Sequence, residues 1–229
     1  VVLELILPDR SKKVTLSRPD YFDFYGVKKN FKLTKLPVVD LVRFGKIGFL
    51  ITALSFSFSL RKYLKERKFD AIYTRDPFSV FFLKGRGMPV FFEAHKMINK
   101  LLIEGIAKRA AGIVSISKNL ASDLESLGVK KEKILVAPDG VDLDIFNLPV
   151  SESEARIRLG LPLDKKICLY SGNLKLPWKG IDTIVKAAEL FGNDVLFVLI
   201  GIGEGEQYNS SNVLYAGHKP HREVPWWLK

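Results

Sequence analysis

The residues best suited to chemistry lie between Tyr170 and Gly180, where a glycine turn and a short basic loop lead into a helix. The chain turns at Gly172 after an apolar strand and presents Lys179 just ahead of a helix expected to begin near Gly180. Free backbone N–H groups and the helix dipole both favour an anion at such a helix start. The pattern therefore predicts a phosphate pocket, and a solvated lysine is the alternative interpretation.

Further candidates follow the ends of expected strands, where ligands bind in open α/β sheets. His95 follows a strand that ends at Glu93, so a ligand-binding role is favoured over a structural one, and Glu93 is a candidate supporting partner. Arg75 and Asp76 follow another strand and are likewise expected to line a ligand site. The alternative for Asp76 is a helix cap, because Pro77 comes next.

A glycine pair and a basic loop follow two later strands. Gly201 and Gly203 come directly after an apolar strand and predict a glycine turn near a ligand, although the fuller dinucleotide fingerprint is absent. Lys219 lies in a loop with His218 and His221 that is also expected to face a ligand. No cluster of histidines and carboxylates has metal-ligand spacing, so we expect neither a metal nor a bound cofactor.

Strands and helices must position these residues, and the chain alternates them as parallel sheets covered by helices do. The expected strands are Val1–Leu7, Asp70–Tyr73, Val90–Glu93, Gly112–Ile116, Ile134–Ala137, Ile167–Tyr170, Val195–Ile200 and Val213–Tyr215. The expected helices are Val39–Arg67, Phe78–Lys84, Ile98–Ala110, a helix from a Ser117 cap to Gly128, Glu152–Leu159 and Gly180–Phe191. Pro138–Asp142 is rich in turn residues and indicates a connector between two successive α/β units.

Two features of this pattern suggest an incomplete sequence. No strand–glycine–helix opening of the nucleotide-binding kind precedes Val1. Gly201–Asn212 is short for a crossover between parallel strands, which needs about a dozen or more residues and usually a helix. We therefore expect missing residues near 203–212, a missing start of the first domain, and a second domain that continues beyond Lys229.

Composition narrows the class of protein. The 229 residues are 47% hydrophobic and carry a net charge of +11, of which residues 1–148 supply +10, with 26 lysines and arginines against 16 aspartates and glutamates. That balance would suit a phosphorylated substrate, an anionic membrane or nucleic acid. The single cysteine, Cys168, excludes a disulfide within the chain. Ile47–Leu60 is uncharged but short for a membrane span, which favours a buried or interfacial helix.

Several motifs together resemble the family 4 retaining glycosyltransferases of the GT-B fold. Pro138-Asp139-Gly140-Val141-Asp142 followed by Phe146 resembles that family's linker, and the loops Gly172–Gly180 and Gly217–Leu228 resemble later segments in the same order. The resemblance implies an α/β protein of two doubly wound Rossmann-type domains facing a cleft. Residues 1–148 would be the acceptor-side domain and residues 149–229 an incomplete donor-binding domain.

The resemblance also assigns roles to the candidate residues. Lys179 matches the lysine that contacts the donor diphosphate, where a fixed cation would neutralise charge on the leaving group. His95 matches the histidine beside the donor sugar and is the expected catalytic residue. The expected lining of the donor site also includes Gly172, Asn173, Gly201, Gly203 and Lys219, and that of the acceptor side includes Arg75 and Asp76. Asn173 departs from the pattern, because the family usually has an arginine there and an amide brings hydrogen bonds without charge.

These roles predict a cytoplasmic, metal-independent transferase that moves a sugar from a nucleotide-sugar, its substrate rather than a cofactor, to an acceptor. The acceptor could be a sugar, a lipid-linked molecule or another small molecule, and a peripheral membrane contact is left open. The alternatives are a GT-B-like binding protein that has lost turnover, as Asn173 suggests, or a nucleotide-sugar epimerase. Nucleic-acid binding is disfavoured, because no aromatic-basic RNA motif or zinc finger is present.

Overall fold

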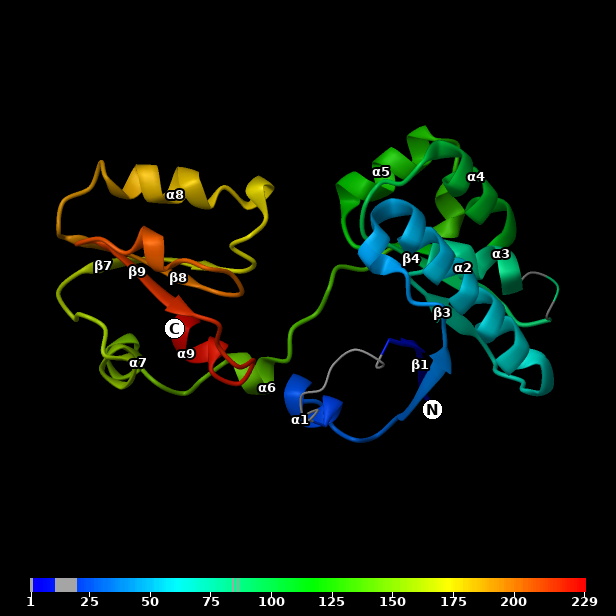
Figure 1. Cartoon of the computed structure of the whole chain (residues 1–229), viewed down its shortest axis with the longest axis horizontal. Coiled ribbons are helices and arrows are strands. Elements are labelled where there is room, and N and C mark those ends of the chain that lie inside the picture. Colours follow the sequence, from blue (N-terminus) through cyan, green and yellow to red (C-terminus); the bar gives the residue numbers. More distant parts are fainter. Residues whose placement is uncertain (1, 11–19, 84, 86) are drawn as a thin grey trace. The chain divides into compact units, whose positions relative to one another are not determined.

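The computed structural model of the chain describes residues 2–10, 20–83, 85 and 87–229 (Figure 1). These residues fold into two compact units, one of residues 2–10 and 29–140 and the other of residues 20–28 and 141–229. The division after Gly140 falls within the stretch that the sequence marks as a connector. The expected domain limit at residue 148 stays a prediction.

The first unit contains two parallel sheets. A two-stranded sheet pairs β1 (Glu4–Asp9) with β2 (Lys32–Pro37). A four-stranded sheet has the order β3 (Ile72–Thr74), β4 (Val90–Ala94), β5 (Gly112–Ser115) and β6 (Ile134–Val136). Ala94 lies beside Ser115 and Ser115 beside Val136, so the carboxyl ends of these three strands are level.

Helices cover this sheet and close its core. They are α2 (Gly45–Tyr63), α3 (Pro77–Leu83), α4 (Lys100–Arg109) and α5 (Lys118–Ser126), with short 3-10 turns at Val42–Phe44, Leu64–Glu66 and Lys131–Lys133. The core is a single cluster that includes Val80, Leu83, Phe92, Ile103, Ile106, Ile113 and Leu124. The predicted cap of α5 is confirmed, because the Ser117 side chain accepts a hydrogen bond from the backbone N–H of Leu120.

The helix expected over Val39–Arg67 is shorter than predicted. The chain is irregular up to Leu41, and α2 begins only at Gly45, whose φ of 68° lies in the left-handed region and interrupts the helix. Gly48 has a different use, because a Cβ there would lie 1.8 Å from the Leu41 carbonyl oxygen. The preceding loop therefore packs directly on the first turn of α2.

The second unit is a three-stranded parallel sheet with helices. Its strands have the order β7 (Lys166–Ser171), β8 (Val195–Ile200) and β9 (Val213–Gly217). Its helices are α1 (Tyr21–Tyr25), α6 (Leu143–Phe146), α7 (Glu152–Leu159), α8 (Ile181–Ala188) and α9 (Val224–Leu228), with 3-10 turns at Pro177–Lys179 and Glu206–Tyr208. The predicted helix Glu152–Leu159 and strand Val195–Ile200 are confirmed at both ends.

The link between β8 and β9 lacks an α-helix, as its composition predicts. The two strands nevertheless pair in parallel, joined by residues 201–212 and the short 3-10 turn Glu206–Tyr208. The buried side-chain amide of Asn212 fixes the end of this link by donating to the carbonyl of Ala188 at 2.7 Å and to that of Phe191 at 3.1 Å. Missing residues in this interval stay a prediction.

Some elements escape the sequence analysis. The strand β2 reads Lys-Leu-Thr-Lys-Leu-Pro, whose lysines and terminal proline weaken the strand signal. The helices α1, α6 and α9 have four or five residues each, too few to show a helical period. None of the helices in the described part of the chain is both long and apolar enough to cross a bilayer.

A substitution at Gly201 tests the packing of the second unit. Gly201 has a φ of 146°, and a Cβ there would lie 1.6 Å from the Gly172 carbonyl oxygen. We expect Gly201→Ala to lower the free energy of unfolding of this unit by about 2 kcal/mol or more, from backbone strain and steric overlap. Urea unfolding followed by tryptophan fluorescence measures this, because Trp178, Trp226 and Trp227 all lie in the second unit.

Gly192→Ala is the matched control for that measurement. Gly192 lies in the same unit and has open space around its Cα. Its substitution should leave the midpoint of unfolding nearly unchanged. Equal midpoints for Gly201→Ala and Gly192→Ala would contradict the close approach of the two loops.

Candidate functional sites

Three strand ends of the second unit meet at glycines. The backbone N–H of Gly172 donates to the Ile200 carbonyl at 3.0 Å, and that of Gly201 donates to the Gly217 carbonyl at 3.0 Å. The Gly172 carbonyl and the Gly201 Cα are too close for any side chain at position 201. The carboxyl edge of this sheet is therefore a tightly packed floor of backbone on which a ligand could lie.

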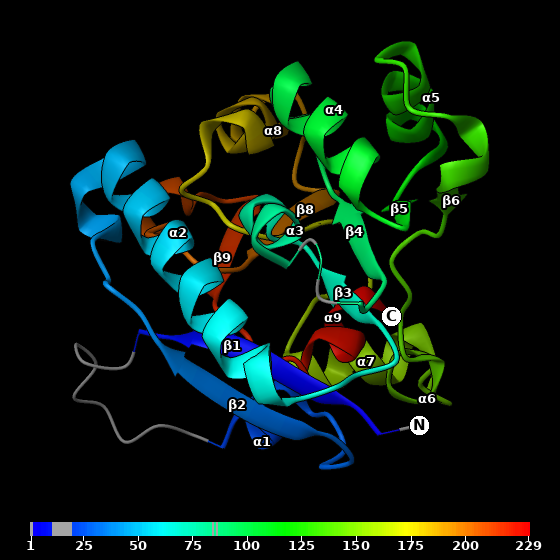
Figure 2. The ribbon, with the colours of Figure 1, turned by 90° about the vertical axis from the view of Figure 1, so that its right-hand side faces the viewer.

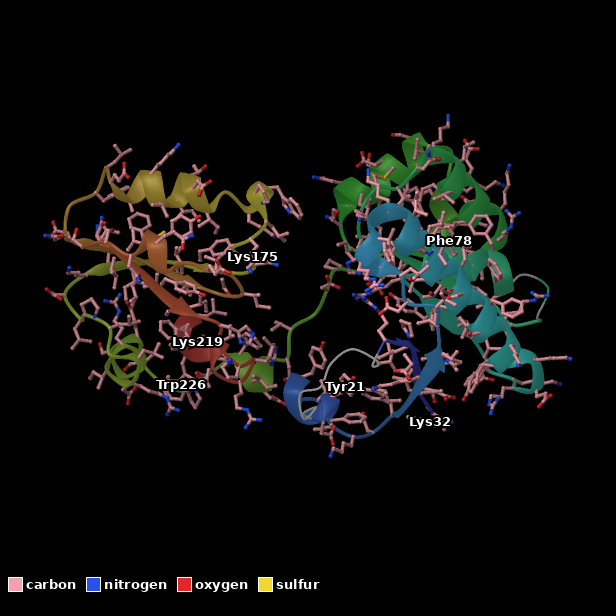
Figure 3. The ribbon with its side chains drawn as sticks, in the orientation of Figure 1. Tyr21, Lys32, Phe78, Lys175, Lys219 and Trp226 are labelled. Atoms are coloured by element: carbon pink, nitrogen blue, oxygen red, sulfur yellow. The ribbon has the colours of Figure 1, made fainter. Side chains whose placement is uncertain are left out.

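A cavity of about 210 Å³ opens on this floor. Its lining includes four residues that the sequence predicts for the donor site, Gly172, Asn173, Gly201 and Lys219. His218, a weaker candidate, also lines it. Lys219 is labelled in Figure 3, and its Nζ lies 4.9 Å from the centroid of the Trp227 ring, close enough for a cation–π contact. The cavity thus combines backbone, an amide, an imidazole and a cation.

Asn173 and Lys175 shape the loop beside this cavity. The Asn173 Oδ1 accepts a hydrogen bond from the backbone N–H of Lys175 at 2.9 Å, so its amide nitrogen is the group left to donate to a ligand. The Lys175 Nζ lies 3.6 Å from the carboxylate of Glu204, an exposed pair of little energetic weight. Both residues of that pair line a neighbouring cavity of about 410 Å³ with Asp182. Lys175 thus lies outside the lining of the 210 Å³ cavity, with its ammonium group beside Glu204.

Lys179 and Gly203 lie outside the lining of the 210 Å³ cavity. Lys179 ends the 3-10 turn before α8 and is exposed, and Gly180 follows it with a φ of 71°. Among the described residues, no side chain caps the start of α8, so its first N–H groups are left to attract an anion. At Gly203 a Cβ would lie 2.9 Å from the Cβ of Leu174, so this glycine packs on the loop before Lys175.

The first unit gathers a polar cluster around the carboxylate of Glu93. This side chain, near the end of β4, is only 7% exposed. The Arg75 Nη2 lies 2.8 Å from the Glu93 Oε1, and the His95 Nε2 forms a short hydrogen bond with the same oxygen. The hydroxyl of Tyr73 also donates to Glu93. Two of the residues predicted from strand ends, Arg75 and His95, therefore meet at one buried carboxylate.

The cluster shifts the acidity of two of its members. Burial alone would raise the pKa of Glu93, but the hydrogen bonds from Tyr73, His95 and Arg75 outweigh it and hold this pKa below its usual value. Burial, and then the hydrogen bond to the Glu93 carboxylate, raise the pKa of Tyr73 to about 12. At neutral pH Glu93 is therefore an anion and Tyr73 a neutral donor. The ionised Glu93 carboxylate can only accept, so the His95 Nε2–H is the donor in their hydrogen bond. Nδ1 is then the ring nitrogen left for another contact.

The same cluster includes the one group, among residues that the structure describes, able to offer three ligands to a metal. These are Glu93, His95 and Asp139, whose ligand atoms lie within 4.8 Å of one another. The Arg75 guanidinium already stands between the two carboxylates, 2.8 Å from Glu93 and 3.8 Å from Asp139. A metal ion would have to displace this cation, so the residues present fit a metal poorly.

The Asp76 side chain is engaged in local structure. Its Oδ2 accepts from the backbone N–H of Ser79 at 2.9 Å and from the Ser57 hydroxyl at 3.1 Å. This is the geometry of a helix cap at the start of α3, the alternative that Pro77 suggests. The acceptor-side role of Arg75 and Asp76 stays a prediction.

Two members of the Glu93 cluster escape the sequence analysis. Tyr73 lies in β3, which runs parallel to β4, with Thr74 beside Phe92. Asp139 follows β6 by three residues. Asp139 therefore carries the same strand-end signal that identifies His95, but the sequence pattern assigns it to the connector. Tyr73 is the last residue of the expected strand Asp70–Tyr73, and the sequence analysis gives it no role.

Comparison with known proteins identifies the family of the sequence. The sequence model of Glycosyltransferase Family 4 matches residues 14–145, which is more than half of the chain. A D-inositol 3-phosphate glycosyltransferase of Xylanimonas cellulosilytica is 37% identical over 108 residues, which is 44% of this chain and 26% of the relative. One of Acidothermus cellulolyticus is 44% identical over 64 residues, 28% of this chain and 14% of the relative. Each match thus spans well under two thirds of the relative.

Solved structures agree on the fold. Anabaena HepE, crystallised with UDP and glucose, superposes with a TM-score of 0.64 at 14% identity, covering 99% of this chain and 71% of HepE. A UDP-GlcNAc 2-epimerase from Neisseria meningitidis gives a TM-score of 0.52 at 11% identity, covering 98% of this chain and 74% of the epimerase. The predicted α/β fold of the GT-B type is confirmed. The family match and this shared fold show that the chain belongs to Glycosyltransferase Family 4.

Proposed function

We propose that this protein transfers a sugar from a nucleotide-sugar donor to an acceptor, with retention at the anomeric carbon. The observation that carries the proposal is the cavity at the carboxyl edge of β7–β9, where Gly172, Asn173, Gly201 and Lys219 come together in a chain of this family. The retaining outcome rests on the resemblance to the family. UDP is the first nucleotide to test, because HepE was crystallised with UDP and glucose.

The second unit would bind the nucleotide diphosphate. In the transfer, the bond between the anomeric carbon and the diphosphate oxygen breaks, and its electron pair leaves with the diphosphate. The acceptor oxygen bonds to the same carbon, and its proton is lost to the departing phosphate oxygen. Lys219, Lys179 and the uncapped start of α8 are the groups in this unit that favour the growing negative charge.

The first unit would supply His95 to the transferred sugar. Its hydrogen bond to Glu93 fixes the ring orientation, and Arg75 on the same carboxylate keeps Glu93 ionised. Glu93 is thus a positioning residue and His95 the residue that would touch substrate. The Arg75 guanidinium lies between the carboxylates of Glu93 and Asp139, where a metal ion would have to bind. We therefore propose a transfer reaction that needs no metal ion.

The acceptor and the place of action are further parts of the proposal. The basic first unit suits a phosphorylated acceptor, and the names of the relatives make an inositol phosphate the first to test. A lipid-linked or sugar acceptor suits the same charge. We place the protein in the cytoplasm with a peripheral membrane contact.

Removing Lys219 should weaken nucleotide binding. We expect Lys219→Ala to raise the dissociation constant for UDP about tenfold, since one charge-assisted contact to phosphate contributes about 1.5–3 kcal/mol. Isothermal titration of the full-length protein measures this, and Lys179→Ala should show a loss of similar size. Lys186→Ala, an exposed lysine on α8, is the matched control. Equal affinity in all four proteins would refute the donor-site assignment.

Replacing His95 should separate turnover from binding. We expect His95→Ala to keep UDP affinity and to lower the transfer rate about a hundredfold or more, because the imidazole would act on the sugar rather than on the nucleotide. Chromatography of the products from the full-length protein distinguishes a transferred sugar from an epimerised donor. Epimerised donor, or an unchanged donor in the native protein, would contradict the proposed reaction.

The Glu93 cluster predicts a pH-dependent stability. A depressed folded-state pKa means that the stabilisation by ionised Glu93 is complete above the unfolded-state pKa of about 4.5 and is lost as pH falls through the folded value. We expect Glu93→Gln to lower the free energy of unfolding by about 1–3 kcal/mol at neutral pH. The difference from the native protein should shrink below about pH 4.5.

Thermal unfolding followed by far-UV circular dichroism measures that difference across pH. Glu132→Gln is the control, because Glu132 is 72% exposed and its contact with Lys130 is long, at 3.9 Å. Its stability should follow that of the native protein at every pH. A constant gap between Glu93→Gln and the native protein from neutral to acid pH would argue against an ionised Glu93.

A further inference from the structure

Helix α2 buries hydroxyl side chains beside a few apolar ones and leaves several large apolar side chains exposed. A helix at a protein surface normally turns apolar residues toward the core and polar residues toward water. In α2 small hydroxyl side chains lie against the protein, and several large apolar side chains face outward. Both views show α2 along the outside of the first unit, where it contacts β2 and α3 (Figure 2).

The inward face of α2 is held by polar contacts. The Thr52 hydroxyl accepts from the backbone N–H of Leu41 at 2.9 Å, and the fully buried Ser57 hydroxyl lies 3.1 Å from the carboxylate of Asp76. Ser59 donates to a backbone carbonyl at the end of β2 at 2.7 Å. Turning the helix about its axis would break these hydrogen bonds, because it would carry the hydroxyls away from Leu41, Asp76 and β2. The rotation of α2 is therefore fixed with its apolar residues outside.

The outward face of α2 is a continuous apolar stripe. Ile47, Ile51, Leu54 and Phe58 follow one another at spacings of four, three and four residues, which places them on one side of a helix. Ile47 is 75% exposed and Phe58 is 64% exposed, and Leu50 widens the stripe. Exposed apolar residues scattered singly need no explanation, but a stripe of this length marks a surface that is covered by something else.

The ends of the stripe are cationic. The sequence from residue 42 to residue 65 contains no aspartate or glutamate. Exposed cations stand at both ends of the helix, Arg43 and Lys46 before the stripe and Lys62 and Lys65 after it. Their flexible stems allow the charged groups to reach past an apolar contact toward phosphate. A partner that fits this surface would be apolar in the middle and anionic at its edges.

A second copy of the chain would fit this surface of α2 poorly. In a two-fold symmetric dimer the same patch faces itself. Because both ends of α2 are cationic, packing the stripe of one copy on that of another would bring lysines and arginines together whichever way the helices run. A bilayer with anionic lipids meets both requirements, since acyl chains accept the stripe and lipid phosphates accept the cations.

We propose that α2 lies flat on a membrane surface that contains anionic lipids, with Ile47, Ile51, Leu54 and Phe58 buried at the boundary of headgroups and acyl chains. Arg43, Lys46, Lys62 and Lys65 contact lipid phosphates at the two ends of the helix. This rests on the peripheral membrane contact in the proposed function and names its surface. It needs neither donor nor acceptor, so its failure would leave the proposed transfer reaction standing.

Vesicle cosedimentation of the full-length protein tests the inference. The probes are vesicles of phosphatidylcholine alone and vesicles that also contain phosphatidylglycerol. We expect binding to the anionic vesicles, weakened by added salt, and at least about a tenfold loss in the double variant Ile47→Ser/Phe58→Ser. The double variant Lys62→Glu/Lys65→Glu should also bind the anionic vesicles more weakly. We expect a loss of about fivefold or more for each of the two lysines replaced.

Leu101→Ser is the matched control, because Leu101 is 76% exposed on α4 of the same unit and lies outside α2. It should bind vesicles like the native protein, and circular dichroism should show native helix content in every variant. Equal binding of the native protein and both α2 double variants would overturn the inference. So would a dimer in analytical ultracentrifugation that Ile47→Ser/Phe58→Ser abolishes without any vesicle binding, because that result assigns the stripe to a second copy.

Discussion

Parallel strands in register bring their carboxyl ends to one edge of a sheet, and both candidate sites of this chain depend on that constraint. In the second unit the level ends of β7, β8 and β9 force Gly172 and Gly201 into backbone contact. In the first unit the ends of β3 and β4 bring Tyr73 and Glu93 together. A change of register by one residue would turn the Tyr73 or the Glu93 side chain to the other face of its sheet.

The two candidate sites differ in how their charged groups are paired. The second unit offers donors without acidic partners at its floor, which suits a ligand that brings its own negative charge. The first unit buries an anion and surrounds it with three donors, so its charge is satisfied before any ligand arrives. Such a preformed cluster holds His95 in one orientation at no cost in ligand binding energy. In the proposed transfer reaction, the second unit would bind the diphosphate and the first would hold the His95 imidazole in a fixed orientation.

The sequence allowed much of this arrangement to be predicted, for a physical reason. Strands β4 and β8 and helix α7 have clear periods and clear ends, and residues placed just after a strand must lie at the sheet edge. The sequence pattern does not predict which neighbour each residue at the sheet edge contacts. Asp76 is one residue from Arg75, yet it caps α3 while Arg75 reaches Glu93. That difference depends on side-chain reach and on competing backbone donors, which strand and helix periods do not reveal.

The segment that forms α2 shows most clearly what the sequence alone leaves undecided. Its uncharged run from Ile47 to Leu60 is too short to span a bilayer, and composition alone leaves a buried helix and an interfacial helix equally consistent. The hydroxyl residues decide between them only once their partners are known. Ser57 finds a carboxylate inside the protein, so the face that carries Phe58 must point away from it. A buried hydrogen bond thus sets which side of α2 stays exposed, because turning the helix would separate the Ser57 hydroxyl from the Asp76 carboxylate.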